Sequence, residues 1–483
     1  MEFICDLKNS TESFPHFWEH TVGSCHATMA LRADYQKQLA RCSAELGFRH
    51  VRFHGLLSDD MGTLMDENDQ LVYSFFNADQ ICDFLLSIGM RPFMELSFMP
   101  STLSSGDDIV FHYKGNVTPP RDYSQWETLI NKLVKHWVDR YGIEEVSLWF
   151  FEVWNEPNLN AFWKGTQADY FKLYQYTARA IKNVHASLKV GGPATADNKW
   201  IPEFLDFCEQ NNVPVDFVST HHYPTDDFGQ PGDDTIAQLA SSTRSALKKE
   251  AAKAKEESKG RPLYYTEWCT SSNPFDELHD DPYAAAFIIK TIMEAHGLVE
   301  GYSYWTFSDI FEENYFCSDP FHGGFGLMNI YGIPKPAYRA FELLHRAGNE
   351  MLKVEGEHET VDVWITRDND TLTIRNTLTI FVTNWALPRH DIKTETITIH
   401  LGGINSVENA YLERIDDTHA NARGAWEAMG KPGSLTPLMV DNLEWKSSLL
   451  KEAVDVNTND NAITITLTIL PQATACITLE LNE

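Results

Sequence analysis

The strongest constraint on the fold of this chain is a regular alternation of short β-like runs and helical stretches between about Phe14 and Arg346. Eight of the runs are apolar and short enough to be buried strands. They are Phe17–Cys25, Arg49–Gly55, Pro92–Phe98, Ser147–Glu156, Leu188–Gly192, Val215–Tyr223, Leu263–Glu267 and Gly301–Phe307. Because strands that alternate with helices form parallel sheets, these units predict an α/β fold of the (β/α)8 TIM-barrel type. A doubly wound sheet is the alternative, but its glycine-rich phosphate loop is absent after the early runs.

The stretches between these runs have the periodicity of amphipathic helices. They lie near residues 34–46, 78–88, 123–141, 166–186, 200–211, 234–258, 281–297 and 336–347. In the fourth stretch, apolar residues recur at three- and four-residue steps, at Tyr170, Tyr174, Thr177, Ile181 and Val184. We expect this stripe to pack against the outside of the barrel.

The pattern changes from about Lys353 onward. Segments of period two at Leu372–Thr379, Glu395–Leu401 and Ala462–Leu470 predict strands, and no long helix is expected among them. The sequence therefore predicts an accessory C-terminal antiparallel β-sandwich, to which the apolar first residues add a strand. The expected domains are a catalytic barrel over residues 14–346 and a sandwich formed by residues 1–13 together with 347–483.

Charge and cysteine usage narrow the range of partners. The chain has 69 Asp and Glu against 39 Lys and Arg, and its net charge of -30 repels nucleic acid and anionic membranes. No apolar run approaches the roughly 20 residues of a membrane-spanning helix, and the N-terminal residues do not have the pattern of a signal peptide. The eight cysteines form no C-x-x-C pair, which is typical of a reducing compartment. We expect a cytoplasmic protein with no nucleic-acid and no membrane partner.

Two short motifs place a glutamate at the end of a predicted strand. W-N-E-P (154–157) ends the fourth run, and Y-T-E-W (265–268) ends the seventh. Either glutamate alone could be a solvated turn residue, but Glu156 and Glu267 can converge because active sites of this fold form at the C-terminal ends of its strands. Two carboxyl groups ~5–5.5 Å apart are the apparatus of a retaining glycosidase, in which one is the nucleophile and the other the acid and then the base.

Several motifs together resemble family 39 of the glycoside hydrolases, in particular its bacterial β-xylosidases. They are W-N-E-P-N (154–158), T-E-W (266–268), S-Y-W-T-F-S-D (303–309), V-R-F-H-G (51–55) with S-D-D (58–60), and H-H-Y (221–223). The resemblance runs through the whole predicted barrel. W-N-E-P alone is shared by many barrel glycosidases, whereas the combination is specific. An accompanying β-sandwich also fits this family.

The resemblance implies roles for four residues. Glu156 would be the acid/base, Glu267 the nucleophile, Asn155 a partner of the sugar 2-hydroxyl, and Tyr223 a partner of the nucleophile or the sugar. The charge of Glu267 would keep Glu156 protonated as the acid, and glycosylation of Glu267 would remove that charge before Glu156 acts as the base. The expected reaction is a retaining, exo-acting release of xylose from the non-reducing end of short xylo-oligosaccharides.

Arg52 and His54 share one face of the second run. Arg52 has two interpretations of equal weight. It could support the ionised nucleophile, or it could pair with an interior acid such as Glu95 or Glu152, since an unpaired acid inside the barrel would be costly.

The other predicted sugar-binding residues come from several loops. Trp305 is expected to form the floor of the first sugar site, because pyranose rings pack their C–H faces on aromatic rings. The remaining candidates are His54, His221, Phe162, Glu312 and Glu313, and the sequence does not say which of the last two contacts the sugar.

Several alternatives stay open at this point. Other activities of the family are α-L-arabinosidase, β-glucosidase and α-L-iduronidase, and a non-catalytic sugar-binding barrel is a further alternative that the presence of both glutamates disfavours. No cofactor and no metal are expected, because His221 and His222 are adjacent on a strand and point to opposite faces. Related enzymes are often homo-oligomers, and the loop around Asp416–Met439 is a candidate for contacts between copies.

Overall fold

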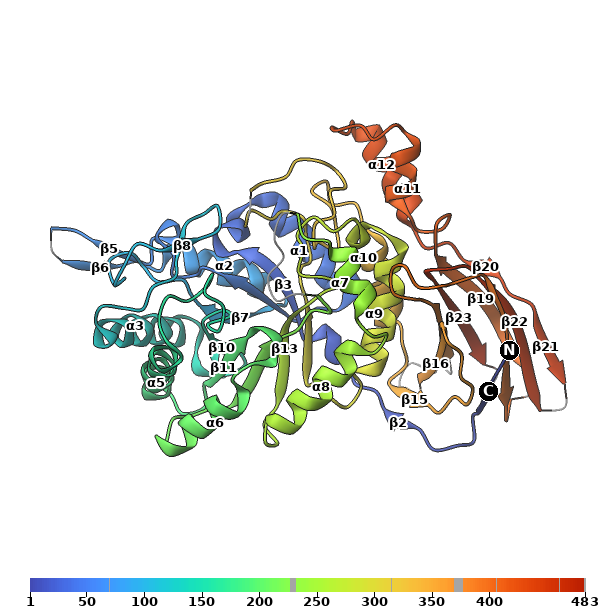
Figure 1. Ribbon diagram of the computed structural model, residues 1–483, viewed down its shortest axis with the longest axis horizontal. Coiled ribbons are helices and arrows are strands. Elements are labelled where there is room, and N and C mark those ends of the chain that lie inside the picture. The colour runs from blue at the N-terminus through green and yellow to red at the C-terminus, as the bar shows by residue number, and fades with distance from the viewer. Residues whose placement is uncertain are drawn as a thin grey trace.

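A computed structural model of the protein describes residues 1–481, apart from 69, 226–231, 314, 369–376, 405 and 460. Within these residues, eight parallel strands close into a barrel (Figure 1). They are, in barrel order, β3 (Thr21–His26), β4 (His50–His54), β7 (Arg91–Leu96), β10 (Phe150–Val153), β11 (Lys189–Thr195), β12 (Phe217–His221), β13 (Leu263–Trp268) and β14 (Gly301–Tyr304). Each strand overlaps one predicted run, so the predicted barrel is confirmed.

Helices surround the barrel between and after these strands. They are α1 (Ala33–Leu46), α2 (Phe76–Ser87), α3 (Tyr123–Tyr141), α4 (Ile143–Val146), α5 (Gln167–Val184), α6 (Ile201–Gln210), α7 (Thr235–Ser241), α8 (Ala246–Glu257), α9 (Pro282–Glu294) and α10 (Pro336–His345). The predicted stripe of α5 is buried from Tyr170 to Ile181, and Thr166 and Asp169 form a capping box at its start.

The prediction of one helix over 234–258 is wrong, since α7 and α8 are separate. The chain leaves α7 at Ser242, which has an extended backbone. Arg244 then reaches the sandwich, where its Nη2 lies 2.6 Å from Asp362 Oδ2 and 2.9 Å from the Thr360 carbonyl oxygen. The break therefore frees Arg244 to join the two parts of the molecule.

The barrel interior has two layers that differ in polarity. Near the N-terminal ends of the strands, Phe93 and Phe150 stack with ring centroids 5.0 Å apart, and Phe217 and Tyr264 pack against them. One step nearer the C-terminal ends lies a buried layer of charged side chains that includes Arg52. The aromatic layer closes the barrel from below, so the charged layer opens only toward the C-terminal face.

The C-terminal half forms two facing sheets. One contains β1 (Glu2–Asp6), β18 (Glu395–Gly402), β22 (Ala462–Ile469) and β21 (Val456–Asn459). The other contains β2 (Glu12–Ser13), β15 (Glu350–Leu352), β16 (Val361–Asp368), β17 (Thr377–Asn384), β23 (Ala473–Leu481), β19 (Val407–Ile415) and β20 (Glu452–Ala453). The sandwich is confirmed, but it is not wholly antiparallel because β1 runs parallel to β18. Of the strand predicted over 372–379, residues 372–376 lie outside the described residues and the rest begins β17.

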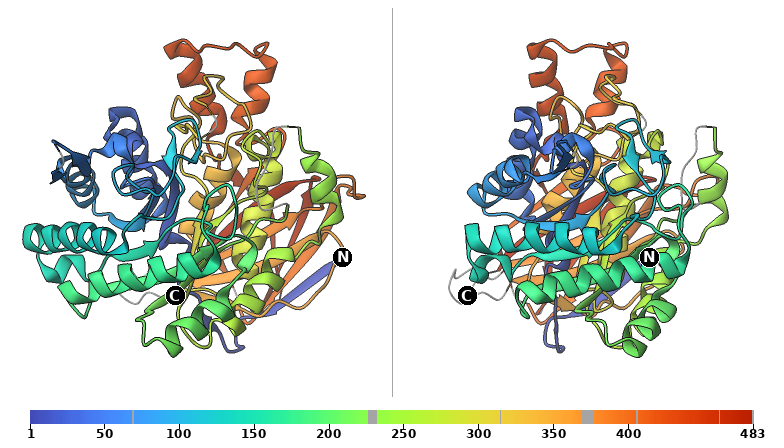
Figure 2. Two further views of the ribbon diagram at one scale, coloured as in Figure 1. Left: turned by 60° about the vertical axis from the view of Figure 1, so that its left-hand side comes forward. Right: turned by 90° about the vertical axis from the view of Figure 1, so that its left-hand side faces the viewer.

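The prediction that this half contains no long helix is wrong. Helices α11 (Ala422–Ala428) and α12 (Pro437–Ser447) form a hairpin that projects from the sandwich (Figures 1 and 2). The ring of Trp426 on α11 packs against Phe321, which follows β14. On α12, Leu438 is 79% and Trp445 57% exposed whereas Leu443 is buried, so its apolar residues form no single stripe that periodicity could detect.

The sandwich and the barrel are packed together. Helix α9 contacts β17 and β23, and the Lys290 ammonium of α9 lies 3.3 Å from Asp362 on β16. Smaller two-stranded ribbons, β5 (Leu64–Asp66) with β6 (Leu71–Tyr73) and β8 (Ile109–Val110) with β9 (Gly115–Asn116), lie in the loops after β4 and β7. A search of the described residues finds no helix that is both long and apolar enough to cross a membrane.

Candidate active site

Glu156 lies in a tight turn directly after β10. Trp154 and Glu156 have φ angles of 72° and 43°, a left-handed conformation that non-glycine residues adopt only when their surroundings enforce it. Two hydrogen bonds fix the turn. The Glu156 amide donates to the Ala194 carbonyl oxygen at 2.8 Å, and the Trp154 indole donates to the Phe162 carbonyl oxygen at 2.8 Å. The buried Glu156 side chain is thereby held at the mouth of the barrel.

Glu267 occupies the end of β13, and two donors hold its carboxyl group. Arg52 Nη1 lies 2.7 Å from Oε1, and the Tyr223 hydroxyl donates to Oε2 at 2.9 Å. Burial raises the pKa of Glu267 to about 7, although the charges of Arg52 and His54 oppose the rise. Arg52 and Tyr223 therefore favour the ionised form, but the dry surroundings still make Glu267 a weaker acid than a carboxyl group in water.

The two glutamates converge on one space, with His221 between them. A carboxylate oxygen of each glutamate and a ring nitrogen of His221 all lie within 4.8 Å of one another. This places the carboxyl groups near the ~5–5.5 Å separation of retaining glycosidases, and well inside the ~6.5–9.5 Å of inverting ones. The convergence that was expected from two strand ends is thus present.

Arg52 is fully buried and contacts four residues. Its Nε lies 2.5 Å from Glu152, and its Nη2 lies 2.9 Å from both Glu95 Oε2 and Asn155 Oδ1. Its Nη1 makes the contact with Glu267. One planar guanidinium therefore pairs with interior acids and also contacts Glu267, and its support of an ionised nucleophile stays a prediction.

A chain of hydrogen bonds runs from Glu156 into the barrel. His221 Nδ1 lies 2.9 Å from Glu156 Oε1, and His221 Nε2 lies 3.0 Å from the Thr266 hydroxyl oxygen. The Thr266 hydroxyl donates its one proton to Glu152 Oε1 at 2.8 Å, so its oxygen accepts from His221 Nε2–H. Burial, with Arg52 and His54 nearby, lowers the pKa of His221 well below its usual value, so the ring is neutral and Nδ1 is an acceptor. Glu156 must then carry the proton that joins it to His221.

The structure separates the roles of Glu312 and Glu313. Glu312 Oε1 lies 2.8 Å from His26 Nδ1, so this carboxylate is paired outside the centre of the site. Glu313 is buried near His54, whose Nε2 lies 3.4 Å away, and among the described residues no hydrogen-bond partner reaches Glu313 Oε1. His54 Nδ1 lies 2.5 Å from Glu95, and although burial opposes a charge on the ring, Glu95 and Glu313 raise the pKa of His54 to about 10.

Comparison with known proteins agrees with this geometry. The chain matches the profile of Glycosyl hydrolases family 39 over residues 4–453. It belongs to this family. It is 49% identical over 470 residues to a β-xylosidase of Caldicellulosiruptor saccharolyticus, and the match covers 96% of this chain and 95% of that protein. A β-xylosidase of Geobacillus stearothermophilus is 38% identical over 452 residues, covering 89% of this chain and 86% of that protein. The crystal structure of a monomeric β-xylosidase from Caulobacter crescentus CB15 has a TM-score of 0.88 and 34% identity, with 100% of both chains covered.

The family resemblance seen in the sequence is therefore confirmed, and this family 39 protein is a glycoside hydrolase. Two of the aromatic residues expected in the sugar site pack against rings near it. The Trp305 ring centroid lies 4.8 Å from that of His54, and Phe162 packs edge-on against Phe111 at 5.3 Å. Trp305 needs a glycine beside it, because a Cβ atom on Gly23 of β3 would lie 2.5 Å from its ring.

His222 points away from the site of the family 39 enzyme, as adjacent strand positions require. Its Nδ1 lies 3.1 Å from Asp197, whereas His221 faces Glu156. Within the site, a group that could hold a metal ion is formed instead by Glu156, His221 and Glu267. Arg52 already contacts Glu267 there, so this group is a poorer place for a divalent cation than its donor atoms alone suggest.

Sequence reasoning missed three residues of the site. Thr266 stands beside Glu267 in the quoted T-E-W motif, but its contacts depend on how β12 and β13 are paired. His26 ends β3, and its ring joins Glu312 to Asp60 by contacts of 2.8 and 2.9 Å. Gly23 lies in the same strand. A histidine at the C-terminal end of the first barrel strand is a signal that the sequence did contain.

Proposed function

We propose that this family 39 glycosidase is a retaining β-xylosidase with Glu267 as nucleophile and Glu156 as acid/base. The observation that carries the proposal is the convergence of the two buried carboxyl groups within 4.8 Å. The two relatives that match almost the whole chain are both named β-xylosidase, which supports the choice of sugar.

The contacts of each glutamate support its role. Glu267 faces a guanidinium nitrogen and a phenol donor, both of which favour the anion that attacks carbon. Glu156 faces the acceptor nitrogen of a neutral His221, which favours the protonated acid. The assignment follows from the partners and not from the order of the residues in the chain.

The reaction proceeds by two displacements at the anomeric carbon. In the first, a Glu267 oxygen attacks this carbon, the bond to the leaving oxygen breaks, and Glu156 gives its proton to that oxygen. In the second, Glu156 takes a proton from water, the water oxygen bonds to the anomeric carbon, and the bond to Glu267 breaks. The anomeric configuration is retained because it is inverted twice.

We assign the first sugar site to side chains around Glu267. Asn155 Oδ1 accepts from Arg52, so its amide NH2 group is left to bind the sugar 2-hydroxyl. Glu313 Oε1 and His54 would bind hydroxyls further round the ring. Trp305 and Phe162 supply apolar faces, and Glu312 acts indirectly through its pairing with His26.

Release of single xylose units from the non-reducing end of short xylo-oligosaccharides is the finer part of the proposal. The test is hydrolysis of nitrophenyl glycosides, namely β-xyloside, α-arabinoside, β-glucoside and α-iduronide, each with and without EDTA. We expect preference for the β-xyloside and no effect of EDTA. Preference for another member would replace the sugar, loss of activity in EDTA would indicate a metal-dependent reaction, and no turnover at all would favour a sugar-binding role. Product analysis with xylotriose then distinguishes exo from endo cleavage.

Three further expectations stay predictions. They are the division of the chain into 1–13 with 347–483 and 14–346, the cytoplasmic location, and assembly into a homo-oligomer. For the last, the α11–α12 hairpin exposes Leu438 and Trp445, whereas the Caulobacter relative is described as monomeric. Light scattering of the full chain measures the oligomeric state directly.

A further inference from the structure

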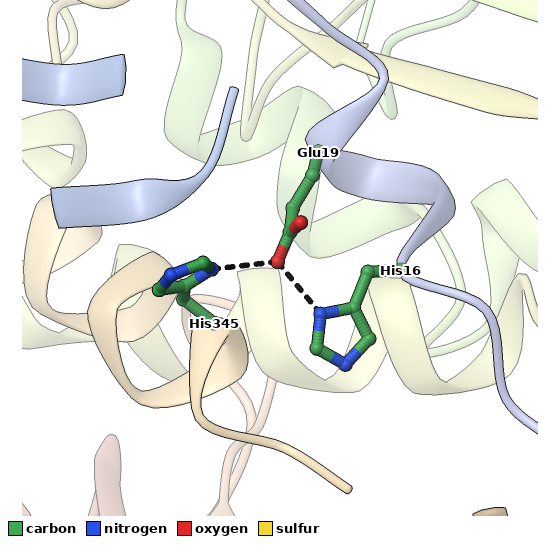
Figure 3. Close-up of side chains that lie close together, drawn as sticks. All are labelled: His16, Glu19 and His345. Atoms are coloured by element: carbon green, nitrogen blue, oxygen red, sulfur yellow. Dashed lines mark hydrogen bonds and ion pairs between the residues drawn. The ribbon is translucent and has the colours of Figure 1, made fainter. Parts of the chain in front are cut away.

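A second group of histidine and glutamate side chains lies at the opposite end of the barrel from the catalytic glutamates. His16 and Glu19 belong to the segment that enters β3, with Glu19 closing the short helix η1 (Phe17–Glu19), and His345 ends α10 (Figure 3). The group therefore joins the first and the last elements of the barrel. Because it lies at the N-terminal end of β3, it takes no part in the glycosidase reaction.

The three side chains point their donor atoms at one another. His16 Nδ1 lies 2.7 Å and His345 Nδ1 2.8 Å from the same oxygen, Glu19 Oε1 (Figure 3). Two imidazole nitrogens and one carboxylate oxygen are the ligand set of zinc sites that keep a fourth position for water. Tetrahedral bonds of ~2.1 Å place ligand atoms ~3.4 Å apart, so binding would need the two contacts to open by about 0.6–0.7 Å. His345 is 39% exposed and can make that adjustment.

The surroundings of His16 fix which of its nitrogens can bind an ion. Its Nε2 lies 3.1 Å from the Ala347 carbonyl oxygen, which only accepts, so Nε2 carries a proton. Nδ1, which faces the carboxylate of Glu19, is then the nitrogen whose lone pair can bind a cation. A ring nitrogen that donates to a backbone carbonyl while the other binds metal is the usual arrangement of metal-bound histidine. Stacking on Trp18, with centroids 4.5 Å apart, holds the ring in place.

Gly47 leaves the space that the group occupies. A Cβ atom at this position would lie 2.6 Å from His345 Nδ1 and 2.9 Å from the carboxyl carbon of Glu19. Gly47 also has a φ of 74° at the end of α1, so both its backbone and its missing side chain are needed here. The group is thus enclosed on one side by backbone and open to solvent beside His345.

We propose that His16, Glu19 and His345 form a binding site for a divalent transition-metal ion of the zinc class. The ion would tie the entry of β3 to the end of α10, the first and last elements of the closed barrel. It would stabilise the fold by an amount that grows with the logarithm of the free ion concentration above its Kd, and it would leave the chemistry of Glu156 and Glu267 untouched.

The test is titration of the untagged full chain with ZnCl2 by calorimetry, after removal of metal with a chelator and exchange into chelator-free buffer. All proteins carry Cys317→Ser, since Cys317 is the one cysteine that is not buried. Each of His16→Gln and His345→Gln removes a ligand, and His185→Gln is the matched control at an exposed histidine. Glu267→Gln reports on binding at the catalytic glutamates.

We expect one equivalent of Zn2+ to bind with a micromolar Kd in the parent, the control and Glu267→Gln. The Kd should rise at least 10-fold in His16→Gln and His345→Gln, and saturating Zn2+ should raise the Tm of the parent by a few degrees but not that of His345→Gln. Binding that survives His345→Gln, or that disappears in Glu267→Gln, would overturn the proposal. So would the absence of binding at millimolar Zn2+, because protons alone would then hold the three side chains together.

Discussion

Replacing Thr266 by valine tests how the protein keeps Glu156 protonated. The hydroxyl of Thr266 accepts from His221 Nε2 at 3.0 Å and donates to Glu152 at 2.8 Å. Valine has nearly the same shape but neither bond. The Nε2–H group of His221 then has no acceptor. The tautomer with the proton on Nδ1 becomes the more stable one, because Nδ1–H can donate to Glu156. That shift favours the ionised form of Glu156 and makes it a poorer acid at the pH of the assay.

The size of the effect follows from the two lost hydrogen bonds. These bonds contribute a net free energy of about 1–1.5 kcal/mol to the preference of His221 for one tautomer. That free energy corresponds to a roughly 10-fold change in rate, or to a shift of about one unit in the pH at which the rate falls. We expect the alkaline limb of kcat/KM to move about one unit toward lower pH. Hydrolysis of xylobiose should slow about 10-fold and that of nitrophenyl β-xyloside less, because a good leaving group needs little protonation.

Thr220→Val is the matched control for Thr266→Val. The buried Thr220 hydroxyl donates to the Thr195 carbonyl oxygen at 2.9 Å and is adjacent to His221 in the chain, but it does not belong to the proton chain. Its loss should lower stability without moving the pH profile. An unchanged alkaline limb in Thr266→Val, or equal losses for both substrates in both variants, would refute the role of Thr266.

Four further substitutions test other parts of the site. Glu156→Ala should lose activity by about 10²–10⁴-fold on xylobiose but by much less on the nitrophenyl substrate. Glu267→Ala should lose nearly all activity on both substrates. Equal losses of activity across leaving groups in Glu156→Ala would contradict the assignment of Glu156 as the acid/base. Tyr223→Phe removes a donor that favours ionised Glu267, so the pKa of Glu267 should rise further above its value of about 7. The acid limb of kcat/KM should therefore move about one unit to higher pH. An acid limb that does not move would contradict Glu267 as the group that must ionise. Gly23→Ala places a Cβ atom 2.5 Å from the Trp305 ring. The added atom should displace the ring and raise KM roughly 10-fold. An unchanged KM for nitrophenyl β-xyloside would show that Trp305 is not the floor of the sugar site.

The barrel and the two glutamates could be predicted because both depend on local sequence. Strand and helix periods are properties of short windows, and a glutamate that ends a barrel strand lies at the mouth in whatever way the helices pack. The contacts of Thr266 could not be predicted in the same way, whereas those of Arg52 were left between two interpretations. The contacts of Thr266 depend on the pairing of β12 with β13, which shifts by one residue between Thr220 and His221.

The hairpin of α11 and α12 was missed for a different reason. Helix α12 buries Leu443 but leaves Leu438 and Trp445 exposed, so its sequence lacks the stripe that marks a packed helix. Its start is encoded locally, because the Thr436 hydroxyl accepts from the Met439 amide and Pro437 follows at the first helical position. Capping residues therefore carried a signal that hydrophobic periodicity did not.

The charge of the barrel interior bears on the choice of sugar. Five carboxyl groups are buried there, those of Glu95, Glu152, Glu156, Glu267 and Glu313. Arg52 and His54 are the cations that contact them among the described residues, and both are already paired with these acids. The excess of acids over cations agrees with the raised pKa of Glu267 and of Glu313 and with the proton assigned to Glu156.

A glycone that brings its own carboxylate would add a charge that this interior cannot neutralise. One uncompensated charge about 6 Å from a carboxylate costs roughly 3 kcal/mol at an effective dielectric constant of 20, or about 100-fold in rate. Xylose has no substituent on C5, whereas iduronic acid has a carboxylate there. We therefore expect kcat/KM for nitrophenyl α-iduronide to lie at least 100-fold below that for the β-xyloside. Comparable rates would require a cation near C5 that is not among the contacts of the five acids, and the charge argument for a neutral glycone would fail.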